Sequence, residues 1–168
     1  MSTFRTYYSL TKPGVLYGNV ITGAAGFLLA AGYFKTFDIW LFVATIVGMT
    51  LIIASACVLN NFLDQDIDRL MERTKTRAIA SGEIPGRNAV VLSVLLGVLG
   101  IIILALWVNW LVVVIGMAGF ITYVWLYGAL SKRLSIHGTL VGSISGAAPI
   151  LAGYCAVSGR IDTAAILL

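Results

Sequence analysis

Charged residues are scarce in this sequence. Only 11% of its 168 residues are Asp, Glu, Lys or Arg, whereas 60% are hydrophobic. Soluble domains carry about 25% charged residues, so this composition excludes an ordinary soluble protein. The mean hydropathy of +0.98 indicates that most of the chain is surrounded by lipid rather than water.

Cysteine and histidine are also rare. Cys57 and Cys155 both lie in apolar segments, and the sequence contains no CxxC or CxxCH pattern. We therefore interpret the two cysteines as small apolar residues rather than as a redox motif or a haem attachment site. The one histidine, His137, is at a predicted helix start, where an interfacial hydrogen bond is commoner than ligation of a metal or haem.

Long apolar runs dominate what is present. A hydrocarbon core of ~30 Å is crossed by a helix of about 20 apolar residues. Five runs are long enough, at residues 15–34, 39–59, 89–107, 110–130 and 139–157, and a sixth begins near Ala164. The first run is too long for a signal peptide and is followed by further spans, so it predicts a retained helix. We predict an all-α integral membrane protein, a multi-helix transmembrane bundle of five complete spans plus the start of a sixth.

The basic residues mark one side of the membrane. If the spans alternate in direction, nine of the eleven lysines and arginines share a side, and Lys35 and Arg160 lie on the other. This positive-inside bias places the amino terminus and the loops at residues 60–87 and 131–137 in the cytoplasm. The net charge of +4 therefore orients a single domain covering residues 1–168 and predicts no nucleic-acid partner.

Residues 60–77 are the most polar part of the chain and hold four of its seven acidic residues. If the preceding helix continues, each step of four residues turns ~40° and rises ~6 Å. Asn60, Asp64 and Asp68 then form a polar stripe, while Asp66 points elsewhere. Carboxylates one turn apart repel each other, and a cation removes that conflict. Mg²⁺ is the natural candidate, since it binds through one or two carboxylates plus substrate phosphates.

Basic residues follow the stripe at helical spacing: Arg69, Arg73 and Arg77, with Lys75 between them. On a continuing helix they would form a second series that suits a ligand with several phosphate oxygens. Lys132 and Arg133, in the second cytoplasmic loop, are either topology markers or further contacts to the same anion. A solvated loop is the alternative interpretation of residues 60–77. The position of Asn60 favours a site, because the apolar run reaches it without a turn residue.

Small residues are frequent in the first and last spans. Gly23 and Gly26, like Gly18 and Gly32, predict close packing of the first span against neighbouring helices. Asn19, in the same span, either bonds to another helix or faces a cavity. Pro149 is expected to kink the last span, whose small residues suit a cavity wall and tight packing equally well.

The motifs of the chain resemble those of a known family. The pattern Asn60-x-x-x-Asp64-x-x-x-Asp68 resembles the first Asp-rich motif of the UbiA-type intramembrane prenyltransferases. Residues 66–84, 11–15 and 142–149 are similar to the protohaem IX farnesyltransferase branch, the haem O synthases. The resemblance covers essentially the whole chain.

This resemblance implies a reaction in which farnesyl diphosphate, haem B and water give haem O and pyrophosphate. It implies that Mg²⁺ is held on the diphosphate by Asn60, Asp64 and Asp68, the two aspartates being the catalytic residues. It also implies diphosphate binding by Arg73, Lys75 and Arg77, with Lys132 and Arg133 as further candidates.

The resemblance further implies a place in the bacterial inner membrane and a fold of about nine helices. We therefore expect this chain to correspond to the amino-terminal part of such an enzyme and to form half a site by itself. The carboxyl-terminal half or a second copy of the chain would be the partner that completes the site.

Three alternatives stay open at the level of the sequence. A related enzyme would use another acceptor, such as a quinone precursor. A cation-coupled transporter would use Asp64 and Asp68 as ion ligands, although transporters usually place such groups near the membrane midplane in broken helices. The third alternative is a membrane fragment without catalytic activity.

Overall fold

Each predicted span is helical in the computed structural model, which describes residues 3–131 and 138–168. The elements are α1 (Thr3–Ser9), α2 (Pro13–Phe34), α3 (Ile39–Leu63), α4 (Gln65–Leu70), α5 (Gly86–Trp107), α6 (Trp110–Ile121), the π-helix η1 (Thr122–Ser131), α8 (Gly138–Ser158) and α9 (Thr163–Leu167). The described residues contain helices and no strand, which confirms the all-α prediction.

Three of the described helices, α2, α3 and α5, are long and apolar enough to cross a membrane. Trp110–Leu126 and Ser145–Ser158 are shorter apolar helices by the same measure. The predicted fourth span is therefore helical but changes its winding at Thr122, where the α-helix α6 gives way to η1. The predicted sixth span corresponds only to the five residues of α9.

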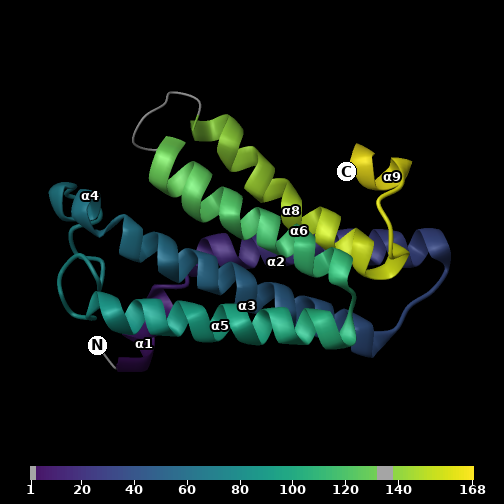
Figure 1. The fold of residues 1–168 in the computed structure, drawn as a ribbon, viewed down its shortest axis with the longest axis horizontal. Coiled ribbons are helices and arrows are strands. Elements are labelled where there is room, and N and C mark those ends of the chain that lie inside the picture. Colours follow the sequence, from purple (N-terminus) through teal and green to yellow (C-terminus); the bar gives the residue numbers. More distant parts are fainter. Residues whose placement is uncertain (1–2, 132–137) are drawn as a thin grey trace.

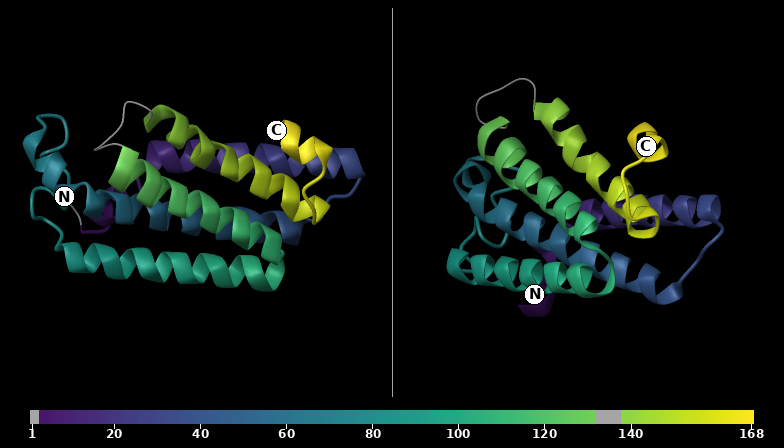
Figure 2. Two further views of the ribbon diagram at one scale, coloured as in Figure 1. Left: turned by 45° about the horizontal axis from the view of Figure 1, so that its top comes forward. Right: turned by 45° about the vertical axis from the view of Figure 1, so that its right-hand side comes forward.

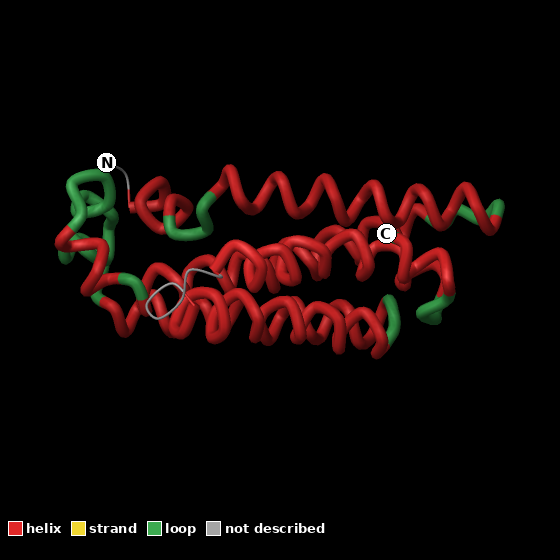
Figure 3. Tube along the Cα trace, turned by 90° about the horizontal axis from the view of Figure 1, so that it is seen from above, coloured by secondary structure: helices red, strands yellow, loops and turns green. Residues whose placement is uncertain are grey.

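The long helices lie side by side, with α3 in the middle of the bundle (Figure 1). Helix α3 packs most extensively against α5, and α8 packs against α2 and α6. Figures 1 and 3 show α1, α4 and the segment between α4 and α5 at one end of the bundle, and α9 at the other. The two further views in Figure 2 keep this separation of the ends.

Exposed tryptophans mark the end of the bundle that carries α9. Trp40 begins α3, and Trp107 and Trp110 flank the tight connection between α5 and α6. Their relative exposures are 79%, 61% and 67%. Tryptophans prefer the headgroup level of a bilayer, so these three side chains indicate where one membrane interface lies. The polar end with α4 then lies at the opposite interface.

Helices α2 and α8 approach each other through glycines. A Cβ atom added at Gly153 would lie 2.0 Å from the carbonyl oxygen of Gly23, and one added at Gly26 would lie 2.1 Å from a carbonyl oxygen of α8. Gly23 and Gly26 therefore pack closely, as predicted. The prediction was wrong for Gly18 and Gly32, because an added Cβ would meet no described atom within 4 Å there.

Asp162, in the connection between α8 and α9, gives the far end of the bundle a pH-sensitive contact. Its Oδ1 accepts a hydrogen bond from the Ala165 backbone N–H at 3.0 Å, and both carboxylate oxygens accept from the Tyr154 hydroxyl at 3.1 Å. The Ala165 N–H and, to a lesser degree, the Tyr154 hydroxyl and the Arg160 charge lower the pKa of the Asp162 carboxyl. The charged form is thus favoured in the folded state.

We expect Asp162 to make stability depend on pH. Because its folded pKa is lowered, its contribution is present above the unfolded pKa of about 3.9 and is lost as pH falls through the folded pKa. Melting of the purified protein in detergent between pH 7 and pH 3 should show this loss. Asp162→Asn caps a helix equally well without titrating, so its melting temperature should fall less over the same pH interval. Equal slopes for the two proteins would contradict the assignment.

Candidate functional site

The polar stripe lies where α3 meets α4. The backbone N–H of Asp64 donates to the Asn60 carbonyl at 2.9 Å, and that of Asp68 donates to the Asp64 carbonyl at 2.8 Å. These two bonds preserve helical spacing across the junction, so the three side chains lie one turn apart, as the sequence predicts. Asn60, Asp64 and Asp68 are only 2%, 0% and 2% exposed, whereas Asp66 is exposed. The stripe therefore faces the protein interior.

The basic residues do not form the predicted second helical series. Helix α4 ends at Leu70, and Met71 is extended, so spacing of four residues no longer places Arg73 and Arg77 on one face. Arg77 instead folds back, and its Nη1 lies 2.7 Å from Oδ2 of Asp68. Arg77 is thus connected to the stripe through the carboxylate of Asp68, whose side chain is 3% exposed.

Burial of apolar side chains explains why the helix stops. Ala78, Ile79 and Ile84 pack in one cluster with Leu10 and Val58 and are almost fully buried. A helix continuing past Leu70 would carry them away from α3 into solvent. The chain therefore turns back, and the segment between α4 and α5 covers the carboxyl-terminal end of α3 rather than forming an open loop.

The other basic candidates lie further from the stripe. Arg69 Nε donates to the carbonyl of Ala80 at 3.1 Å, which ties α4 to the returning segment. Lys75 pairs with the exposed Glu72 at 2.7 Å, and Arg73 is exposed. Lys132, Arg133 and His137 fall outside the described residues.

Lys12 reaches the stripe from another helix. It precedes α2 in the left-handed conformation with φ 50°, and its Nζ donates a hydrogen bond to Oδ1 of Asn60. The same ammonium lies 5.9 Å from the centre of the Tyr123 ring, a cation–π contact. Sequence reasoning counted Lys12 among the basic residues on one side of the membrane and, within residues 11–15, in the family resemblance, but did not place it at the site. Its place immediately before Pro13, at the start of a span, was the available clue.

The segment before Lys12 is fixed by buried polar contacts. The Asn61 amide nitrogen donates to the Leu10 carbonyl at 2.7 Å, in a buried environment. The Thr6 hydroxyl donates to Glu83 at 2.9 Å, which connects α1 to the segment before α5. These contacts hold the start of α2 against the end of α3, and so hold Lys12 beside Asn60.

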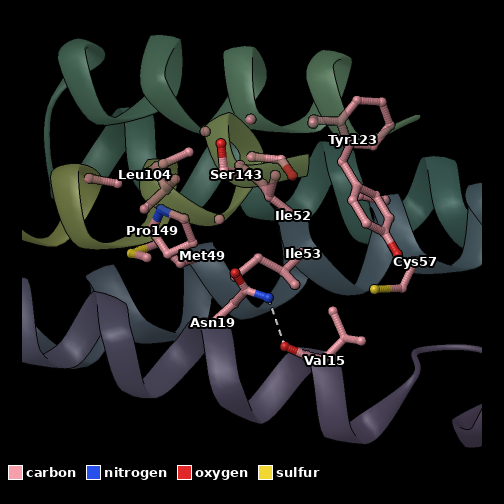
Figure 4. Close-up of a pocket in the computed structure, with 18 residues that line it drawn as sticks. Val15, Asn19, Met49, Ile52, Ile53, Cys57, Leu104, Tyr123, Ser143 and Pro149 are labelled. Atoms are coloured by element: carbon pink, nitrogen blue, oxygen red, sulfur yellow. Dashed lines mark hydrogen bonds between the residues drawn. The ribbon is translucent and has the colours of Figure 1, made fainter. Parts of the chain in front are cut away.

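An apolar cavity of about 560 Å³ begins next to the stripe, a volume typical of ligand pockets. It is lined by α2, α3, α6, η1 and α8 and by Leu104 of α5 (Figure 4). Cys57 and Tyr123 both line it, and Cys57 is only three residues before Asn60. A ligand with an anionic head at the stripe can therefore place an apolar tail in this cavity.

The cavity lining decides between the alternatives that the sequence left open for Asn19 and for the last span. Asn19 lines it and donates its amide N–H to the Val15 carbonyl of its own helix at 2.8 Å (Figure 4). The cavity alternative is therefore correct for Asn19. Pro149 and Ala152 line the cavity from α8, while Gly153 on the same helix packs against α2. Helix α8 is thus both a cavity wall and a packing surface.

The stripe fits a hard cation that is shared with a ligand. Its donors are one amide and two carboxylates, the oxygen groups that Mg²⁺ prefers. Among the described residues, the buried Asn60 Nδ2 has no hydrogen-bond partner, while Oδ1 of the same amide accepts from Lys12. In the part of the chain that the structure describes, no three His, Cys, Asp or Glu side chains gather into a closed metal site. Substrate oxygens and water would therefore complete the coordination of Mg²⁺.

Comparison with known proteins identifies the family and similar sequences. Residues 9–168 match the model of the UbiA prenyltransferase family. The chain is 47% identical to a protoheme IX farnesyltransferase of Salmonella arizonae and 44% identical to one of Photorhabdus laumondii, each alignment covering 98% of this chain and 55% of the relative. The chain thus spans about half the length of these curated relatives.

A solved structure supports the fold independently. It comes from a study of digeranylgeranylglyceryl phosphate synthase in membranes and superposes with a TM-score of 0.80. The superposition covers 93% of this chain and 54% of that chain, at 23% identity. With the family match over almost the whole sequence and this shared helical architecture, the chain belongs to the UbiA prenyltransferase family.

Proposed function

We propose that this chain binds the prenyl donor in an enzyme that transfers a farnesyl group from farnesyl diphosphate to haem B, giving haem O. The observation that carries the proposal is that Lys12 contacts both Asn60 of the buried stripe and Tyr123, which lines the apolar cavity. A prenyl diphosphate has the matching shape, with a charged head on a hydrocarbon tail. Haem B as the acceptor is supported by the names of the relatives.

The residues of the stripe have distinct roles in this proposal. Asn60, Asp64 and Asp68 would hold Mg²⁺, which when bound neutralises charge on the diphosphate. Arg77 pairs with Asp68 and keeps that carboxylate turned toward the stripe, so we assign it a positioning role. Lys12 supplies a cation beside Asn60. Arg73, Lys75, Lys132 and Arg133 are further candidates for contacts to diphosphate oxygens.

The chemical step needs charge stabilisation rather than a general base. When the allylic C–O bond breaks, its electron pair goes to the leaving diphosphate, and positive charge spreads over the allylic carbons. Fixed cations such as Lys12 stabilise the growing charge on the diphosphate more strongly than the ground state. The apolar walls exclude water, so the allylic cation meets the haem vinyl group first. Water then adds to the second vinyl carbon and releases a proton, which leaves a hydroxyl group there.

The cavity volume supports a divided site. A volume of about 560 Å³ suits one farnesyl chain but not a chain together with a haem. We therefore propose that the haem is bound largely by a carboxyl-terminal half like that of the longer relatives, or by a second copy of the chain. We also propose a bacterial inner-membrane location with the stripe facing the cytoplasm, supported by the basic residues around it.

Cation transport is the rival that the geometry disfavours. Carboxylates of transporters usually lie near the membrane midplane in interrupted helices. Here Asp64 caps the end of α3, and Asp68 lies in the short helix α4 and pairs with Arg77. A cationic side chain in the site suits an anionic ligand better than a transported cation.

The proposal is tested by incubating the purified chain in detergent with farnesyl diphosphate, Mg²⁺ and haem B. Mass spectrometry should detect the hydroxyethylfarnesyl product and pyrophosphate, and both should disappear with a chelator. The assay is repeated with the chain fused to the carboxyl-terminal half of a relative. Product in neither preparation, with the haem intact, would refute haem B as the acceptor.

Lys12→Met is expected to weaken binding of farnesyl diphosphate about 10–100-fold, because a hydrogen bond to a charged group is worth ~1.5–3 kcal/mol. Lys12→Arg should keep most of the affinity, since it keeps the charge. Binding is measured by titrating the purified chain with farnesyl thiolodiphosphate, an analogue that ionises very slowly, in the presence of Mg²⁺.

Lys35→Met is the matched control for Lys12→Met. Lys35 lies at the other end of α2 in the same left-handed conformation, with φ 51°. The two variants therefore share the chemical change and a similar φ, and Lys35 lies at the end of α2 away from the stripe. Equal losses of affinity would show that Lys12 acts through the helix and not through the ligand.

A further inference from the structure

The deep end of the cavity is closed by two side chains. Met49 of α3 and Leu104 of α5 both line it, and they are 4% and 0% exposed. They lie at the opposite end of the cavity from Cys57 and the stripe, because Met49 is about two helical turns before Cys57 in α3. Both belong to the main hydrophobic core, which also includes Phe27, Tyr154 and Cys155. The cavity therefore has a floor, which we define as Met49 and Leu104.

Each floor residue packs against a glycine of a neighbouring helix. A Cβ atom added at Gly23 would lie 2.4 Å from Cε of Met49, so this methyl group occupies the space left by the missing side chain. A Cβ added at Gly48 would lie 2.5 Å from Cδ2 of Leu104 in the same way. The ends of both floor side chains therefore pack closely against helix backbone.

The depth of the floor matches one prenyl length. Asn60 and Met49 are eleven residues apart on α3, which corresponds to ~16 Å along the helix axis. A farnesyl group has a main chain of about twelve carbons, which with bonds of ~1.5 Å extends over about 15 Å. By the same estimate a geranyl group extends over about 10 Å and a geranylgeranyl group over about 20 Å.

Gly116 keeps the lower part of the cavity open. It lines the cavity from α6, and a Cβ added there would lie 3.4 Å from Cδ1 of Ile52. Ile52 is eight residues before Asn60, or ~12 Å along the axis. A large side chain at Gly116 would therefore fill the cavity between the lengths of a geranyl and a farnesyl group.

We propose that the floor formed by Met49 and Leu104 selects a farnesyl chain by its length. The absence of a side chain at Gly116 leaves room for the last isoprene unit of that chain. This inference rests on the proposed binding of a prenyl diphosphate at the stripe. It assigns Met49, Leu104 and Gly116 as specificity-determining residues, none of which belongs to the polar motif.

The test compares three ligands on the purified full chain in detergent with Mg²⁺: the thiolodiphosphates of geraniol, farnesol and geranylgeraniol. The unmodified chain should bind the farnesyl ligand about 10-fold or more tightly than the geranylgeranyl ligand. Met49→Ala should abolish or invert this preference, and Gly116→Leu should shift it toward the geranyl ligand. Val47→Ala, on the exposed face of α3, should leave it unchanged.

The outcomes distinguish failure of the proposed function from failure of the floor alone. If the unmodified chain binds none of the three ligands, the proposed function fails and the floor fails with it. If it binds them but Met49→Ala keeps the original preference, the floor alone is overturned. Met49→Leu, which conserves volume, guards against misfolding: a folded Met49→Leu chain with farnesyl preference supports the proposal, and one with the preference lost overturns it.

Discussion

Asp64→Ala is expected to abolish prenyl transfer, lowering the rate by about 1,000-fold or more. Asp64 is fully buried in the middle of the stripe, where its carboxylate would hold Mg²⁺ against the leaving diphosphate. The fold should survive, because removing one of two buried carboxylates a turn apart relieves their repulsion. The rate is measured by pyrophosphate release in the preparation that shows transfer, and circular dichroism and melting in detergent report the fold.

Asp66→Ala is the matched control for this prediction. Asp66 lies two residues from both Asp64 and Asp68 but is exposed, so the substitution removes an equal charge outside the stripe. We expect its rate to stay within about threefold of the original, as is usual for a surface substitution. Similar losses in the two variants, or unchanged turnover in Asp64→Ala, would refute the role of the stripe.

The stripe could be predicted because it is a local feature. Once residues 39–59 are identified as a span, helical spacing alone brings Asn60, Asp64 and Asp68 together. The structure adds one refinement, the break at Asp64, where φ and ψ are −85° and −5°. The i to i−4 backbone bonds continue through this break, so the sequence-based geometry survives it.

The basic residues could not be placed in the same way, because long-range contacts decide where they lie. Whether α4 continues past Leu70 depends on the burial of Ile79 and Ile84 against α3, which spacing along the chain does not reveal. Lys12 meets Asn60 across 48 positions in the sequence. Its role becomes visible only when α2 and α3 are placed side by side.

Helix α8 shows a further limit of sequence reasoning. A run of small residues around a proline is compatible with a cavity wall and with close packing, and the composition cannot distinguish between them. In the structure the two roles are divided by position, since Ala152 faces the cavity and the adjacent Gly153 faces α2. Only the orientation of the helix relative to its neighbours separates the roles.

Gly153→Ala is expected to lower the free energy of unfolding by about 1–3 kcal/mol, the usual cost of overpacking. The added Cβ would lie 2.0 Å from the Gly23 carbonyl oxygen and 2.9 Å from the Phe27 backbone nitrogen. Both are backbone atoms, so α2 and α8 must move apart. Melting of the purified chain in detergent measures the loss. Affinity for farnesyl thiolodiphosphate should fall as well, because α2 and α8 both line the cavity.

Gly18→Ala makes the same chemical change with the opposite expected sign. Gly18 lies in α2, and an added Cβ would meet no described atom within 4 Å. Alanine is favoured over glycine in a helix by up to ~1 kcal/mol, so this variant should melt at the same or a higher temperature. Because helix propensity acts equally at both sites, the difference between the variants isolates the contact between α2 and α8. Equal shifts in melting temperature would mean that this contact does not set the separation of the two cavity walls.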